Sequence, residues 1–503
     1  MSRAAIEFPI TADRGGGRLS GQIAGQLRSG ISDGRLGAGE RLPASRVLAA
    51  SLGVSRTVVT AAYGQLYAEG WLEGRHGSGT FVAFGAPGQA SPPWHSAGPA
   101  AAPRRAAAPG PVPRHDPAGQ DDLAGQHDPV APVIELRPGI PWASGIDRAA
   151  WRRAWRQAGI VPPSAWPDPF GLPALRDALA GHLRRSRALH CAPGQILVTR
   201  GVTSGLGLLA AALLRPGDRV GIEEPGYPSA RAVFAAHGAE VVPCTADEHG
   251  LVTGDLPGDL RMVYTTPAHQ YPLGGRLPVP RRQSLIGWAR ATGALIVEDD
   301  YDSEFRYDVA PLPALFGLDP GVVVHLGTTA KTLTPAMGVG WLVARDDLAA
   351  LVAGARRDIS DRTSEAAQHA MLTLLRSGDL DRHVRRMRRE YARRRAEIVA
   401  ALGDLPGPVR LLGDTAGLHV VLELPAGTAG QVAARAGRRG VAVTTMARYF
   451  AGQPSADGLV LGYGGASLSQ VSRACQVLRQ IVAELSPASR RPAAPRPAVS
   501  LPG

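Results

Sequence analysis

Residues 321–343 read GVVVHLGTTAKTLTPAMGVGWLV, in which two apolar runs flank a polar turn. Runs that are apolar almost throughout are typical of strands covered on both faces of a sheet. The turn carries Lys331, which is the only lysine of the chain beside 54 arginines. Arginine can replace lysine wherever a solvated positive charge is enough, but a guanidinium stays protonated and forms no Schiff base with an aldehyde. A lysine kept alone in this composition is therefore a candidate for covalent chemistry.

Further apolar runs alternate with helical segments on either side of this stretch. They are ILVT (196–199), RVGIEE (219–224), RMVYTT (261–266) and ALIVEDD (294–300). Alternation on this scale predicts an α/β domain with a mainly parallel sheet, here over residues 133–486. In such a sheet the ligand-binding groups belong at the carboxyl ends of the strands.

Chemically distinctive side chains follow several of these strand ends. Besides Lys331 they are Asp299, Tyr301, Thr328 and Tyr227, with Thr203 and Ser204 at the start of a helix. Exposed NH groups at a helix start, with two hydroxyls, can bind an anion. A lysine, a carboxylate that keeps a pyridine nitrogen protonated, an anion site and a stacking ring together describe a pyridoxal phosphate site. Each residue alone also has an ordinary alternative role, as a turn former, a wall residue or a surface charge.

The N-terminal part, residues 15–83, has the pattern of a small DNA-binding domain. Ile23, Leu27 and Ile31 recur at four-residue spacing and predict a first helix, and a second helix stops at Gly53. A third helix follows Ser55 as its cap, with a core stripe of Val59, Ala62, Tyr63 and Leu66. Two short runs, WLEG and GTFVA, then predict a hairpin. This order is the layout of a winged helix-turn-helix.

In this layout the start of the third helix and the wing contact DNA. The candidates are Ser55, Arg56, Thr57 and Thr60 on the helix, and Arg75 and His76 at the wing tip. Arg56 can reach a guanine edge or a phosphate, and the threonines can reach phosphates or bases. A solvated surface role is the alternative for any one of them.

Residues 40–83, ERLPASRVLAASLGVSRTVVTAAYGQLYAEGWLEGRHGSGTFVA, resemble the DNA-binding domain of GntR-type repressors along their whole length. The resemblance implies that Arg46, Arg56, His76 and Gly77 contact DNA.

The larger part of the chain also resembles a known family. PGDRVGIEEPGYPSAR, TTPAHQYPLGG, IVEDDYDSEFRYDVAPLPAL and GTTAKTLTPAMGVGWLV are similar to the fold-type I aminotransferase-like domain of MocR-type regulators. The resemblance implies that Lys331 forms the Schiff base, that Asp299 pairs with the pyridine nitrogen and that Tyr301 reaches the phenolic oxygen of the ring. It further assigns the phosphate to Thr328 and the 201–204 turn, and stacking to Tyr227. A homodimer is implied as well, because fold-type I sites are built between two subunits.

Departures from the family pattern concern the cofactor and a substrate carboxylate. Ala330 replaces the usual serine before the lysine, and Gly338 stands where the family has a phosphate-binding arginine. Loss of such a charge-assisted contact should cost roughly 1.5–3 kcal/mol, or about ten- to hundredfold in affinity. The segment GLVLGYGG offers no arginine for an α-carboxylate, and Arg448 is the nearest candidate.

The remaining features concern the connecting segments and the cellular setting. The Pro- and Ala-rich residues 84–132 are expected to be a linker, and residues 487–503 a disordered tail. Cys191, Cys244 and Cys475 lack metal-ligand spacing, so no metal is expected, and their number fits a reducing cytoplasm. No signal peptide or membrane span is recognisable, and the net charge of +12 favours a polyanionic partner.

The sequence thus predicts a cytoplasmic transcription regulator and not an enzyme. Its expected partners are a double-stranded DNA operator, a second copy of the chain, and as effector a small amino compound or pyridoxal phosphate itself. Two alternatives stay open: an active aminotransferase with a DNA-binding head, and a degenerate body that binds no cofactor and serves only for dimerisation. The missing arginines argue against the first alternative.

Overall fold

The computed structural model describes residues 10, 11, 13, 19–32, 35–37, 40–68, 71–75, 79–82, 133–307, 313–405, 407–413 and 415–485. The predicted linker and tail lie outside these residues, as do His76 and Gly77 of the predicted wing tip. Arg75 is described only as the last residue of a strand. Predictions that concern these segments stay predictions.

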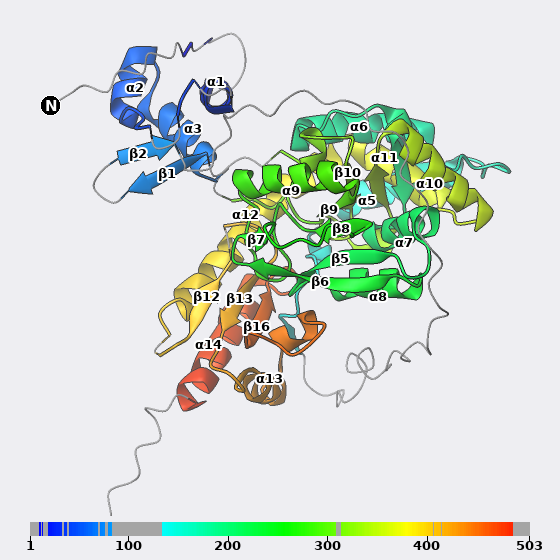
Figure 1. Cartoon of the computed structure of the whole chain (residues 1–503). Helices are drawn as coiled ribbons and strands as arrows, with labels where there is room; N and C mark the ends of the chain where they lie inside the picture. Colours follow the sequence, from blue (N-terminus) through cyan, green and yellow to red (C-terminus); the bar gives the residue numbers. More distant parts are fainter. Residues whose placement is uncertain are drawn as a thin grey trace, which may run out of the picture.

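The N-terminal domain has the predicted order of three helices and a hairpin (Figure 1). Its elements are α1 (Leu19–Ser32), α2 (Ser45–Leu52), α3 (Arg56–Ala68), β1 (Leu72–Arg75) and β2 (Gly79–Val82). The apolar residues predicted to face inward are buried in one core: Ile23, Leu27, Ile31, Val59, Ala62, Tyr63 and Leu66. The two strands pair antiparallel from Leu72↔Val82 to Arg75↔Gly79. The winged helix-turn-helix fold is therefore confirmed.

The body is built around an eight-stranded sheet in the order β4-β11-β10-β9-β8-β5-β6-β7. The strands are β4 (Ile196–Thr199), β5 (Arg219–Glu224), β6 (Glu240–Asp247), β7 (Gly250–Leu251), β8 (Met262–Thr265), β9 (Leu295–Asp300), β10 (Val323–Thr328) and β11 (Gly340–Val343). Strands β10, β9, β8, β5 and β6 are parallel, whereas β11 pairs antiparallel with both of its neighbours. The prediction of a mainly parallel sheet is confirmed.

Helices cover both faces of this sheet, as a parallel sheet requires. One core contains residues of α5 (Arg148–Ile160), α6 (Pro173–Arg187), α9 (Val279–Thr292) and α11 (Glu365–Arg376). The other contains residues of α7 (Val202–Leu213), α8 (Pro228–Ala236) and α10 (Asp346–Asp358). Ile296 of β9 enters the first core and Val297 the second. Because side chains alternate along a strand, Asp299 lies on the face of Val297, and Glu298 and Asp300 lie on the opposite face.

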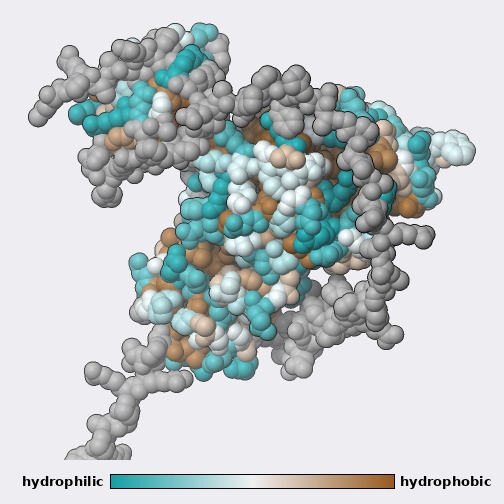
Figure 2. All heavy atoms as spheres, viewed as in Figure 1, coloured by the Kyte–Doolittle hydropathy of each residue, from teal (hydrophilic) through white to brown (hydrophobic). Residues whose placement is uncertain are grey.

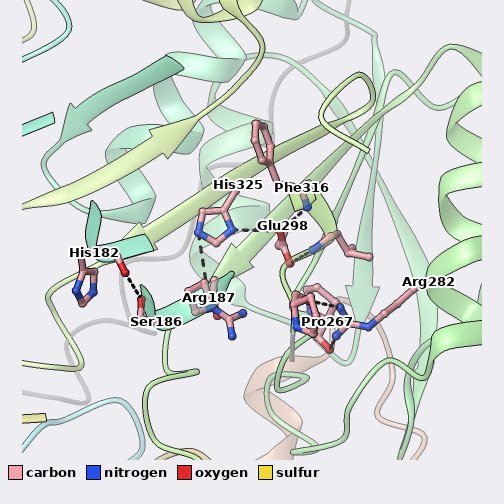
Figure 3. Close-up of polar contacts among 11 residues, drawn as sticks. His182, Ser186, Arg187, Pro267, Arg282, Glu298, Phe316 and His325 are labelled. Carbon is pink, nitrogen blue, oxygen red and sulfur yellow. Dashed lines mark hydrogen bonds and ion pairs between the residues drawn. The ribbon is translucent and has the colours of Figure 1, made fainter. Parts of the chain in front are cut away.

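A buried polar network holds this opposite face of β9 (Figure 3). Arg187 Nε donates to Asp300 Oδ2 at 2.5 Å, and His325 Nδ1 of β10 lies 3.1 Å from Glu298 Oε2. The Leu315 amide donates to the other carboxylate oxygen of Glu298. Buried charges need such partners, and the network fixes the end of β9 from behind the cavity described below.

A smaller C-terminal domain packs a four-stranded antiparallel sheet against helices. Its strands are β12 (Arg410–Leu412), β13 (His419–Glu423), β15 (Thr444–Thr445) and β16 (Gly458–Gly462), and its helices are α12 (Asp379–Leu402), α13 (Ala429–Arg438) and α14 (Leu468–Leu485). A separate pair joins β3 (Ile134–Glu135) in parallel to β14 (Val441–Ala442). The first described segment of the body is thereby attached to its C-terminal domain.

The surface of the body mixes hydrophilic and hydrophobic residues on the face that Figure 2 shows. Among the described helices, none combines the length and the apolar character that a membrane span needs.

Candidate functional site: a cavity at the strand ends

A cavity lies at the carboxyl ends of β4, β5, β8, β9 and β10, where ligand groups were predicted. Of the predicted residues, six line it: Lys331, Asp299, Tyr301, Tyr227, Thr328 and Thr203. Ser204 is not among the lining residues, although its hydroxyl is buried and has no hydrogen-bond partner. The fold therefore gathers side chains that lie more than a hundred residues apart in the chain.

Asp299, at the end of β9, is 4% exposed and presents its two carboxylate oxygens differently. Oδ2 accepts a hydrogen bond of 2.6 Å from the Tyr264 hydroxyl, whereas Oδ1 is buried without a partner. Burial raises the pKa of Asp299 to about 7; Asp300 adds to the rise and the bond from Tyr264 opposes it. An unsatisfied buried acceptor costs about 1–3 kcal/mol, and a ligand that donates to Oδ1 would remove that cost.

Lys331 follows β10 and points into the cavity that Asp299 shares. Its Nζ donates a hydrogen bond of 2.7 Å to the carbonyl oxygen of Gly139. Burial lowers the pKa of Lys331, and the carboxylates of Asp299 and Asp302 act in the opposite direction. A lowered pKa makes a larger fraction of the amine neutral, which is the nucleophilic form.

Tyr301 lines the cavity and connects it to a buried chain of polar groups. Its hydroxyl lies 3.0 Å from His269 Nδ1, which in turn lies 2.9 Å from Asp302 Oδ2. Burial raises the pKa of Tyr301 well above its usual value, with Asp302 contributing, so the phenol stays protonated. Donor atoms of His269, Asp302 and His419 all lie within 4.8 Å of one another. No spacing in the sequence predicts this group, because its members come from three segments.

The end of the cavity near α7 has the features of an anion site. Gly201 precedes the helix with φ of 103°, and Thr203 lies in its first turn. Thr328 lines the same end, where its hydroxyl accepts a hydrogen bond of 3.1 Å from the amide of Ala330. Gly338 also lines the cavity, and a Cβ built there would meet nothing within 4 Å. The absent arginine side chain thus leaves open space in the wall.

Two cations occur among the described residues that line the cavity, namely Lys331 and Arg200. Arg200 also pairs with Asp361, at 2.7 Å. Arg448, the nearest candidate for binding a substrate carboxylate, is exposed and does not line the cavity. The structure therefore does not bring Arg448 into the site.

Aromatic rings form much of the remaining wall. Tyr227 stacks on Tyr264 with ring centroids 6.5 Å apart, and Tyr271 meets Tyr227 edge-on at 6.0 Å. Sequence reasoning missed Tyr264, Tyr271 and Gly139. Tyr264 lies in the run RMVYTT, whose carboxyl end could have been searched, but nothing local predicts the role of Gly139.

In the N-terminal domain the predicted DNA-contacting residues that are described lie together on the outside. Arg46, Ser55, Arg56, Thr57 and Thr60 are all exposed. Arg56 Nε is 3.4 Å from the Ser45 hydroxyl at the start of α2, and the hydroxyls of Ser55 and Thr57 are 2.7 Å apart. The starts of α2 and α3 therefore form one polar, basic surface.

Comparisons with known proteins divide the chain in the same way. Residues 19–82 match the family of bacterial regulatory proteins of the gntR type, and residues 150–454 match aminotransferase class I and II. Among solved structures, an archaeal alanine:glyoxylate aminotransferase superposes with a TM-score of 0.67 at 24% identity, covering 73% of this chain and 94% of that one. The class is therefore a transcription regulator with a winged helix-turn-helix head and an aminotransferase-like body of fold type I.

Two relatives with the same architecture narrow the class. The pyridoxine biosynthesis transcriptional regulator PdxR of Corynebacterium glutamicum is 38% identical over 93% of this chain and 95% of its own length. MocR of Rhizobium meliloti, described as a probable rhizopine catabolism regulatory protein, is 34% identical over 94% of this chain and 97% of its own. The chain belongs to the MocR-type subfamily of GntR transcription regulators.

Proposed function

We propose that the protein is a DNA-binding regulator that binds pyridoxal phosphate in the cavity around Lys331, and that this binding controls its affinity for an operator. The observation that carries the proposal is the pairing, in one cavity, of a partly buried amine with a buried carboxylate whose Oδ1 has no partner. A protonated pyridine nitrogen would supply the missing donor to Asp299, and the helix start at Thr203 would bind a phosphate.

The other residues take roles that fit the same ligand. Lys331 is the attachment point, Tyr301 faces the phenolic oxygen of the ring, and Tyr227 stacks on the ring. Thr203 and Thr328 bind the phosphate at the start of α7. When bound, pyridoxal phosphate supplies an aldehyde that condenses with primary amines. A solved relative supports this assignment: LysN of Thermus thermophilus, 26% identical with a TM-score of 0.64 over 70% of this chain and 92% of that one, is complexed with N-(5'-phosphopyridoxyl)-L-leucine.

Pyridoxal phosphate itself is the effector that the cavity favours over an amino acid. An amino acid substrate needs a cation for its α-carboxylate, and of the two lining cations Lys331 is committed to the aldehyde. Arg200 is then needed to bind the phosphate, because Gly338 supplies no guanidinium. Among the described residues, no lining cation is left for an α-carboxylate. The name of the Corynebacterium relative, a regulator of pyridoxine biosynthesis, agrees with this choice. Transaminase turnover should therefore be slow or absent.

The DNA-binding side of the proposal uses the basic surface of α2 and α3. Arg46 and Arg56, with Ser55, Thr57 and Thr60, read the operator, and Arg75, His76 and Gly77 of the wing complete the contact. Two copies of the chain form a homodimer whose two heads bind two half-sites of double-stranded DNA. The protein acts in the cytoplasm, where its DNA target is accessible.

Two measurements on the full chain test the proposal. Purified protein is mixed with pyridoxal phosphate and reduced with borohydride, and mass spectrometry locates the adduct, which should be at Lys331 and absent from Lys331→Arg. An operator is then selected from a random double-stranded DNA library, and its affinity is compared with and without pyridoxal phosphate. The proposal would be contradicted if wild-type protein formed no adduct. It would also be contradicted if pyridoxal phosphate did not change the affinity for the operator.

A further inference from the structure

The first described segment of the body contacts Lys331. Residues 133–142 follow the predicted linker directly, and the carbonyl oxygen of Gly139 accepts the 2.7 Å hydrogen bond from Lys331 Nζ. Gly139 has φ of +87°, and a Cβ built on it would lie 3.0 Å from that same Nζ. A side chain at position 139 would therefore displace the amine of Lys331 from its place beside the Gly139 carbonyl.

The rest of this segment, residues 133–142, which we call the strap, is fixed to the C-terminal domain on both sides of Gly139. Before Gly139, the Ile134 amide donates to the carbonyl of Gly440 at 2.8 Å. The Leu136 amide donates to the carbonyl of Ala442 at 2.9 Å. After it, the Trp142 amide donates to the Tyr391 hydroxyl of α12 at 2.8 Å. Gly139, which lies between these two attachments, is the contact of the strap with Lys331.

Condensation with an aldehyde changes what Lys331 can donate. The amine nitrogen forms a C=N bond, the aldehyde oxygen leaves as water, and of the three hydrogens on the ammonium form one at most remains. With at most one hydrogen left on the nitrogen, and the phenolic oxygen of pyridoxal phosphate as a competing acceptor, Lys331 would no longer donate to Gly139. The Gly139 carbonyl then loses its donor.

We infer that the strap reports the covalent state of Lys331 to the DNA-binding domain. Free Lys331 holds the strap through Gly139, and reaction of Lys331 with an aldehyde releases it. Because the strap is the chain segment through which the body continues into the linker, its release changes how the winged domains of a dimer are presented to DNA. The inference rests on the proposed binding of pyridoxal phosphate at Lys331.

The first test follows the strap directly by hydrogen exchange in the full-length protein, with pyridoxal phosphate alone as the ligand. Amides of residues 134–142 should exchange about tenfold faster in the loaded protein, within the usual range of coupling between sites. Adduct formation is measured in the same samples. No adduct would overturn the proposed function, whereas an adduct with unchanged exchange of the strap would overturn only this inference.

The second test uses Gly139→Ala, which should push the strap and Lys331 apart without removing the amine. Its matched control is Gly293→Ala, at the end of α9, where φ is +74° and a Cβ meets nothing within 4 Å. Both substitutions place a side chain on a backbone with positive φ, but only Gly139→Ala changes a residue that contacts Lys331. Gly139→Ala should still form the adduct while its operator affinity no longer depends on pyridoxal phosphate, and Gly293→Ala should respond as wild type does. A normal response of Gly139→Ala would overturn the inference; if that variant fails to fold, the exchange experiment decides.

Discussion

The Tyr264 hydroxyl donates a 2.6 Å hydrogen bond to Oδ2 of Asp299 and so leaves Oδ1 as the carboxylate oxygen that faces no partner. The two residues lie on neighbouring parallel strands, β8 and β9. One oxygen is thereby held by the protein and the other is kept for a ligand. This division of one carboxylate is the geometric reason for assigning a pyridine nitrogen to Asp299.

Replacing Tyr264 by Phe should therefore weaken binding of pyridoxal phosphate. The bond from Tyr264 lowers the pKa of Asp299, so its loss favours the neutral carboxyl, which pairs less well with a protonated nitrogen. A hydrogen bond to a charged group contributes about 1.5–3 kcal/mol, which corresponds to about ten- to hundredfold in affinity. Absorbance titration near pH 7.5 measures it. Tyr449→Phe, outside the cavity lining, is the matched control, and equal losses in both variants would contradict the assignment.

The stability of the ligand-free protein should depend on pH through Asp299. Burial raises its folded-state pKa to about 7, above the value near 4 of an unfolded chain. A group with a raised folded-state pKa contributes stability that is fully present below the unfolded pKa and is lost as pH rises through the folded one. The melting temperature of wild type should therefore fall relative to that of Asp299→Asn between about pH 4 and about pH 7, and should run parallel to it above that range. Parallel melting curves of the two proteins over this range would show that Asp299 is not perturbed.

Arg200 should matter for the phosphate of the cofactor and not for its ring. Among the described residues that line the cavity, Arg200 is the arginine, and Gly338 stands where the family has another one. Arg200→Ala should weaken binding of pyridoxal phosphate about tenfold while binding of pyridoxal, which has no phosphate, stays unchanged. Arg152→Ala, an exposed arginine of α5, is the control. Equal losses for the two ligands would place Arg200 away from the phosphate.

Arg56 should determine operator recognition, whereas the arginines of α12 should not. Arg56→Ala is expected to lose about 1–3 kcal/mol of specific binding if it contacts a guanine edge. The control is Arg389→Ala, on the exposed face of α12, a strongly basic helix of the body. Anisotropy titrations with the selected operator at several salt concentrations measure both. A loss for Arg389→Ala as large as that for Arg56→Ala would show that the body also binds DNA.

Much of the fold follows from local patterns, because each pattern reflects one element meeting one core. The four-residue spacing of Ile23, Leu27 and Ile31 requires a helix with a single buried face, and all three residues are at most 1% exposed. The run before Lys331 is apolar at almost every position, which predicts a strand covered on both faces. Every residue of β10 is indeed buried. Ser204 illustrates the limit: a hydroxyl at a helix start is easily identified, but its direction depends on helix phase, and it does not line the cavity.

The sequence alone predicts the two domain types and singles out Lys331 as a candidate for covalent chemistry, because the solitary lysine and the periodicities are properties of the chain before it folds. The tertiary structure decided which groups surround that lysine. Gly139 is 192 residues away from Lys331, yet its carbonyl accepts the bond from Nζ. Likewise, the Tyr264 hydroxyl donates to Asp299, whereas Arg448 does not line the cavity. Such contacts depend on how strands and domains pack against one another, and no local pattern records that packing.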